Sequence, residues 1–120
     1  AVAVPAYRDH VIRGKLAEAS ATLSQMRVQL EQYFQDNRTY VGACAAGTNV
    51  PIPTGRYFTY TCPAPTATAY TATATGVAAE GMTGFTYTIT QANVRATTSL
   101  PAGWGATNTG CWVTKKGGQC

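Results

Sequence analysis

The most regular pattern in this chain lies in residues 5–35, which read PAYRDHVIRGKLAEASATLSQMRVQLEQYFQ. Apolar side chains recur there every three or four positions, which places them on one stripe of an α-helix. This stripe consists of Ile12, Leu16, Ala19, Leu23, Met26, Leu30 and Phe34. The pattern predicts one amphipathic helix over residues 1–36. Asp36-Asn37 is its expected stop, because asparagine tolerates the left-handed backbone at a helix end.

A helix of this length should extend beyond a domain of 120 residues, since some 30 residues span about 45 Å. Pro5 should mark a bend or the start of the helix, because proline removes a backbone donor. We expect the residues up to Val11 to associate with another molecule. The lower part of the stripe should pack on the protein's own sheet, through Leu16, Leu23, Met26, Leu30 and Phe34.

Beyond residue 56 the hydrophobic period changes to two, and threonine supplies most of the polar half of the alternation. Runs 57–62, 70–75 and 85–90 alternate in this way, and a shorter run follows at 94–98. Such alternation is typical of half-buried strands with one covered face, here with the threonines outward. The short connections between the runs predict antiparallel neighbours.

These patterns together predict an α+β fold in a single domain of residues 1–120. One long N-terminal helix should pack on a four-stranded antiparallel sheet over residues 56–98, because the sheet's apolar face needs a cover. Residues 37–55 should form the helix-to-sheet loop, and residues 99–120 a disulfide-bounded C-terminal loop.

Four cysteines stand at positions 44, 62, 111 and 120, with no Cys-x-x-Cys pair and one histidine in the chain. This spacing fits zinc poorly and favours two disulfides, hence an oxidising compartment such as the periplasm or the cell exterior. Three pairings are open. The pairs Cys44–Cys62 and Cys111–Cys120 are favoured because each closes a local loop, worth about 3 kcal/mol.

The net charge of +4 is unevenly placed. Residues 39–120 hold four basic side chains and one carboxylate, Glu80. A field of this size fits weak attraction to an anionic polymer or surface, and falls short of the basic density of a dedicated nucleic-acid binder.

The chain lacks the patterns that catalysis would need. A Gly-x-Ser-x-Gly elbow, a phosphate-binding glycine loop, a metal-ligand cluster and a close carboxylate pair are all absent. No apolar run reaches the roughly 18 residues of a membrane span. The sequence therefore predicts a protein that is not an enzyme and holds no metal or cofactor.

Lys115 and Lys116 lie between the last two cysteines, close to Trp112. One interpretation is a solvated hairpin tip whose lysines aid solubility. The other is a contact point for an anionic partner, such as DNA phosphates, neighbouring subunits or a host surface, aided by Arg95 and Trp112. Lysine contacts to phosphate depend on salt and convey no base information.

Four segments resemble a known family: PAYRDHVIR (5–13), YFQDNRTY (33–40), FTYTI (85–89) and CWVTKK (111–116). They resemble the region that follows the hydrophobic N-terminal segment of bacterial type IV pilins, and are similar to PilE-like minor pilins of proteobacteria. The resemblance implies the pilin fold and a non-catalytic structural subunit of a type IV pilus. Such a subunit supports pilus assembly, twitching motility, adhesion or DNA uptake; a pseudopilin of a type II secretion system is the alternative.

The resemblance also implies partners and a location. The partners are other pilin subunits in a filament at the bacterial cell surface, after a stage in the inner membrane and periplasm. The hydrophobic half of the helix, which carries the family's methylated N-terminal residue and its assembly glutamate, would precede Ala1, so the chain would be an N-terminally truncated pilin.

Individual positions take on meaning from the same resemblance. Pro5 corresponds to the helix-bending proline, and Cys111–Cys120 to the disulfide that bounds the C-terminal loop. Cys44 and Cys62 are additional to the single disulfide of many major pilins, which favours a minor pilin. Related four-cysteine minor pilins include a DNA-uptake receptor.

Overall fold

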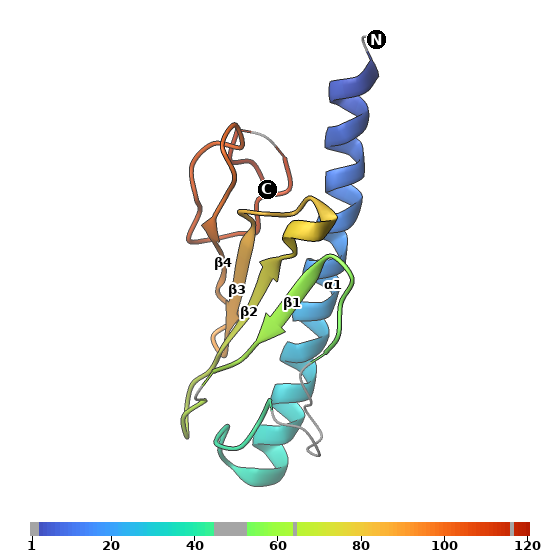
Figure 1. The fold of residues 1–120 in the computed structure, drawn as a ribbon. Coiled ribbons are helices and arrows are strands. Elements are labelled where there is room, and N and C mark those ends of the chain that lie inside the picture. Colours follow the sequence, from blue (N-terminus) through green and yellow to red (C-terminus); the bar gives the residue numbers. More distant parts are fainter. Residues whose placement is uncertain (1–2, 45–52, 64, 116) are drawn as a thin grey trace.

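One long helix and one four-stranded sheet make up the fold. The computed structural model describes residues 3–44, 53–63, 65–115 and 117–120. The sheet is antiparallel throughout, and its strands are arranged in chain order (Figure 1). The predicted α+β architecture is thus confirmed. The elements are α1 (Ala3–Asn37), β1 (Phe58–Thr61), β2 (Thr71–Gly76), the 3-10 helix η1 (Ala78–Glu80), β3 (Thr86–Thr90) and β4 (Arg95–Ser99).

Helix α1 begins and ends close to the predicted residues. Pro5 lies in the first turn of α1 that the structure describes, and the helix continues regularly after it to Asn37. At the other end, Arg38 rather than Asn37 takes the left-handed backbone, with φ of 59°. The Arg38 N–H donates to the Phe34 carbonyl at 2.7 Å. The Asn37 side chain instead donates to the Tyr33 carbonyl at 3.0 Å.

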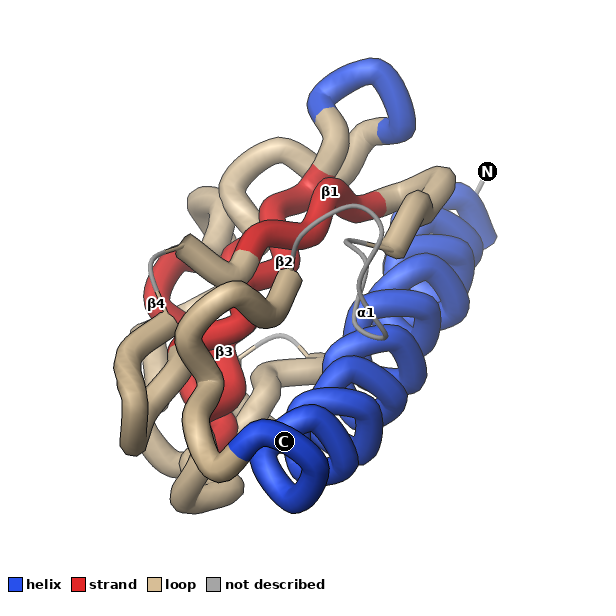
Figure 2. The backbone as a smooth tube through the Cα atoms, turned by 90° about the horizontal axis from the view of Figure 1, so that it is seen from below, coloured by secondary structure: helices blue, strands red, loops and turns tan. Residues whose placement is uncertain are grey.

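The core lies between α1 and the inner face of the sheet. Figure 2 shows the helix on one side of the strands, where it contacts β2 and β3. Ala72 and Ala74 of β2 are fully buried, and their short side chains let the helix approach closely. Phe34, at the lower end of the stripe, is only half-buried against the core. The fully buried stripe residues are Leu16, Ala19, Leu23, Met26 and Leu30.

The outer face of the sheet is a threonine surface, as predicted. Cross-strand partners form rows across β1, β2 and β3, for example Thr61, Thr73 and Thr88. Threonines on this face are exposed or half-buried. Threonine pairs across strands stabilise a sheet by roughly 0.2–1 kcal/mol each.

The N-terminal turns of α1 extend past the sheet (Figure 1). The molecule is accordingly elongated, with axes of 55, 26 and 18 Å. This protrusion agrees with the expectation from helix length. Within the described ranges, α1 and η1 both fall short of the length or apolarity that a bilayer-spanning helix requires.

Two disulfides cross-link the loops. Cys44, just after α1, is bonded to Cys62 at the end of β1, with Cα atoms 5.8 Å apart. Cys111 is bonded to Cys120, with Cα atoms 6.2 Å apart. These are the two pairings that the local loops favour. The expected helix-to-sheet loop falls partly on residues 45–52, which lie outside the described residues.

Candidate functional site

A row of rings crosses the inner face of the sheet and ends at a surface cation. The Phe58 and Tyr87 rings have centroids 6.1 Å apart. Tyr87 and Trp112 follow at 5.9 Å, with planes inclined by only 12°. The Arg95 guanidinium carbon lies 4.9 Å from the Trp112 ring centroid. Since an aromatic face attracts a cation, Trp112 holds the exposed Arg95 side chain in place at the start of β4.

Hydrogen bonds hold the Trp112 segment, residues 111–113, against β3 and β4. The Trp112 indole N–H donates to the Thr88 carbonyl at 2.9 Å, and the Tyr87 hydroxyl donates to the Val113 carbonyl. Burial raises the pKa of the Tyr87 phenol, so this hydroxyl stays protonated and able to donate. The segment therefore covers the part of the inner face next to α1.

Lys115 sits on a turn that follows this segment. The backbone N–H groups of Thr114 and Lys115 donate to the Gln119 carbonyl at 2.9 and 3.2 Å. The Cys111–Cys120 disulfide closes the same turn. The Lys115 side chain is exposed, which agrees with a hairpin tip. Lys116, the second predicted lysine, lies outside the described residues.

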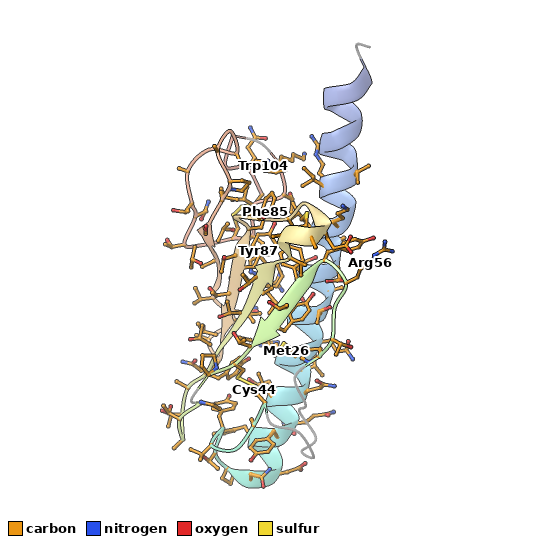
Figure 3. The ribbon with its side chains drawn as sticks, viewed as in Figure 1. Met26, Cys44, Arg56, Phe85, Tyr87 and Trp104 are labelled. Carbon is orange, nitrogen blue, oxygen red and sulfur yellow. A yellow bond between two sulfur atoms is a disulfide. The ribbon has the colours of Figure 1, made fainter. Side chains whose placement is uncertain are left out.

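Trp104 packs the rest of the C-terminal loop onto the core. Its ring meets Phe85 edge-on, with centroids 5.0 Å apart, and Figure 3 shows Phe85, Tyr87 and Trp104 near one end of the sheet. The Trp104 carbonyl accepts from the N–H groups of Gly117 and Gly118 at 3.1 and 2.9 Å. This ties the beginning of the loop to its end.

Arg95 and Lys115 are both exposed cations. Neither forms an ion pair with any residue that the structure describes. Arg56, at the opposite edge of the sheet, is different: its Nε lies 3.8 Å from a Glu80 oxygen. Within the described residues, the β4 edge and the C-terminal turn thus carry positive charge that no ion pair neutralises.

Across the residues that the structure describes, no three or more His, Cys, Asp or Glu side chains come together to bind a metal ion. Exposed cations on a rigid aromatic support can bind an anionic surface or polymer.

The family model for "Type IV minor pilin ComP, DNA uptake sequence receptor" matches residues 5–99. That span includes α1 from Pro5 onward, all four strands and Arg95. The chain belongs to this family of type IV minor pilins. The predicted membership of the type IV minor pilins is confirmed, and the family places the protein in the surface pilus.

A solved structure is also similar to this minor pilin. It is the non-core minor pilin PilV of Neisseria meningitidis, with a TM-score of 0.60 and 17% sequence identity. The alignment covers 77% of this chain and 91% of the other. At this identity the likeness concerns the fold, which it confirms. No curated protein sequence matches the chain.

The predicted site residues of the pilin are brought together in part. Arg95 and Trp112 are in contact, and Lys115 follows three residues later on the closed turn. One expectation needs correction: Trp112 is only 7% exposed, so it supports Arg95 from below and does not reach a partner itself. The reason is that Trp112 packs in the core beside Tyr87, with the Arg95 guanidinium over its ring.

Sequence reasoning missed Thr97 and the hydroxyl of Tyr87 in this minor pilin. Thr97 lies in the run RATTS (95–99), where apolar and polar residues do not alternate. Its inward position follows only from its register opposite Tyr87. A burial of 99% could not be read from a threonine in a threonine-rich chain.

Proposed function

We propose that this minor pilin binds double-stranded DNA through Arg95 and Lys115, as one subunit of a type IV pilus. The observation that carries the proposal is that Arg95, at the start of β4, and Lys115, on the anchored C-terminal turn, are both exposed and form no ion pair within the described residues. The family description as a receptor for DNA uptake sequences supports it.

The reach of the two cations suits a phosphate backbone. Lys115 is two residues from Val113, and Arg95 is two residues from Thr97, while Val113 N–H bonds to the Thr97 hydroxyl. Two residues span at most about 7 Å on each side of this bond, so the two Cα atoms lie within roughly 20 Å of each other, and both cations can contact phosphates of one duplex. Such contacts position DNA and supply salt-dependent affinity.

The structural part of the proposed role belongs to α1. We propose that its projecting N-terminal turns pack against other pilin subunits, and that the protein passes through the inner membrane and periplasm before assembly. Fold and family are those of structural subunits. The proposal therefore assigns the protein no catalytic step, and its activity arises from assembly and binding.

Fluorescence anisotropy with a labelled duplex tests the DNA role, at low and at moderate salt. Arg95→Ala and Lys115→Ala should each weaken binding and lower the slope of log K against log salt by about 1. Arg56→Ala is the matched control, since it removes the same charge from the opposite edge of the sheet. Binding that survives Arg95→Ala and Lys115→Ala unchanged would refute the proposal.

A further inference from the structure

Thr97 is the buried polar residue of the core, with 1% of its surface exposed. Its backbone N–H donates to the Asn108 carbonyl at 2.7 Å, and its carbonyl accepts from the Asn108 N–H at 3.2 Å. Its hydroxyl donates to the Cys111 carbonyl at 2.9 Å and accepts from the Val113 N–H at 2.8 Å. All four hydrogen bonds of this one strand residue therefore lead to the C-terminal loop.

The disulfide of that loop has a different structural role. Cys111 and Cys120 both belong to the loop, so their bond closes the loop upon itself and does not attach it to the sheet. Attachment comes from the sheet side, from Thr97 on β4 and from Tyr87 and Thr88 on β3. Thr97 holds both ends of residues 111–113, the segment whose central Trp112 carries Arg95.

A β-branched side chain suits this task. Threonine has few χ1 rotamers in a strand, so its hydroxyl is held in one direction by the β4 backbone. A buried hydroxyl must also be paired, because leaving it unpaired costs roughly 1–3 kcal/mol. The loop is thus directed to a single place on the sheet, where its two hydrogen bonds to Thr97 can form.

We infer that Thr97 is the positioning residue of the DNA site. Its hydroxyl sets where Trp112, and with it Arg95 and the Lys115 turn, stand on the edge of the sheet. The inference rests on the proposed DNA binding. In it, Thr97 holds the site in its binding conformation before DNA is bound.

Two substitutions at one position test it. Thr97→Val keeps the shape of the side chain and removes both hydroxyl hydrogen bonds, whereas Thr97→Ser keeps the hydroxyl. We expect Thr97→Val to weaken duplex binding about fivefold to tenfold, the effect of losing one to two hydrogen bonds, and Thr97→Ser to restore most of it. Thr98→Val, on the outer face one residue away, is the matched control and should bind as the unaltered protein does.

A second readout follows the loop directly. Amide hydrogen exchange at Val113 should speed up in Thr97→Val and stay slow in Thr97→Ser and Thr98→Val, because the Val113 N–H donates to the hydroxyl that is removed. Binding is measured under conditions where circular dichroism shows each variant folded, so a loss of global stability alone leaves the affinity unchanged. Should Thr97→Val fail to fold, Tyr87→Phe releases the Val113 carbonyl and should change affinity and exchange in the same direction.

The outcomes separate the two claims. The inference is supported if Thr97→Val binds DNA more weakly and exchanges its Val113 amide faster, while Thr97→Ser and Thr98→Val do neither. Unaltered binding by Thr97→Val, beside a clear loss for Lys115→Ala, would overturn the inference and leave the proposed function standing. Unaltered binding by Arg95→Ala and Lys115→Ala would overturn the proposed function, and the positioning role with it.

Discussion

Helix α1 and the Trp112 segment both pack on the same face of the sheet, but the segment adds directional hydrogen bonds to its apolar packing. The helix covers β2 and β3 with an apolar stripe that includes Leu16, Leu23 and Leu30. The segment covers the neighbouring part of the face and is held by hydrogen bonds from Thr97 and other strand residues.

The contrast shows how one sheet can separate stability from position. Apolar burial is strong and non-directional, so the helix supplies free energy without depending on a single contact geometry. Hydrogen bonds are weaker in net free energy but directional. They therefore fix where the segment lies on the sheet, and with it the turn that carries Lys115.

The largest effect should come from the helix cover. Leu23→Ala removes a fully buried side chain at the centre of α1, and should lower the free energy of unfolding by about 2–5 kcal/mol. Guanidinium denaturation measures this loss. Gln25→Ala, exposed on the same helix, should stay within about 0.5 kcal/mol. If Leu23→Ala lost no more unfolding free energy than Gln25→Ala, the helix would not be the main source of stability.

The disulfides should come next. Cys44→Ser with Cys62→Ser opens a loop of 18 residues, and Cys111→Ser with Cys120→Ser one of 9. Each pair should lower stability by about 3 kcal/mol, with the longer loop costing about 0.6 kcal/mol more. Denaturant unfolding of the two double variants provides the comparison.

The shorter loop also offers a check on the contrast itself. Because Thr97 and not the disulfide attaches the loop to the sheet, the Val113 N–H should remain protected from exchange when Cys111 and Cys120 are serines. Complete loss of that protection would show that loop closure, rather than the strand, positions the segment.

A smaller effect should follow from one hydroxyl in the hydrogen-bonded cover. Tyr87→Phe keeps the ring beside Phe58 and Trp112 and leaves the Val113 carbonyl without its donor, at a cost of about 1–2 kcal/mol. Tyr40→Phe is the control, because the Tyr40 hydroxyl makes only a long contact of 3.4 Å to Glu31. Thermal unfolding should rank Tyr87→Phe clearly below Tyr40→Phe; equal losses would argue against a directional attachment.

The smallest effect near neutral pH should be at Tyr70, which lies in the core with 3% of its surface exposed. No described residue bonds to its hydroxyl. Tyr70→Phe should therefore leave stability unchanged or raise it by less than about 1 kcal/mol, as denaturant unfolding at neutral pH would measure.

The same residue predicts a pH dependence. Burial raises the pKa of Tyr70 from 10.0 to about 12. Its contribution is complete below pH 10 and is lost as the pH rises toward 12, because the unfolded chain releases the proton first. Between pH 10 and 12 the free energy of unfolding should fall less steeply with pH for Tyr70→Phe than for the unaltered protein. The two slopes should differ by up to about 1.4 kcal/mol per pH unit. Identical curves would mean that the phenol ionises as easily in the folded state.

Much of the fold could be predicted because it depends on periodicity. The stripe with spacings of three and four residues predicts α1, and the alternation with threonine predicts β1 to β3 and their inward residues. β4 was located by its place after β3 rather than by its own pattern. The 3-10 helix η1 had no signal of this kind, since its three residues Ala78–Glu80 show no repeat.

The candidate site was only partly predictable. Charge and position pointed to Arg95 and Lys115, and an even number of cysteines pointed to the closed turn. Trp112 was expected to aid the contact with an anionic partner, yet its ring is buried and touches Tyr87 and Arg95 instead. That depends on a contact between residues 17 positions apart in the chain, which no local pattern contains.

For this minor pilin, the sequence by itself determined the helix, the strands and the face that each buries, because these follow from side-chain spacing along a regular backbone. Only the tertiary structure decided which threonine is a core residue and where the irregular C-terminal loop rests. Threonine is the residue type that predominates on the outer face, but the register of Thr97 opposite Tyr87 places it on the inner face. Its role comes from directional bonds to residues 108–113, and these exist only once the loop has folded back across β4.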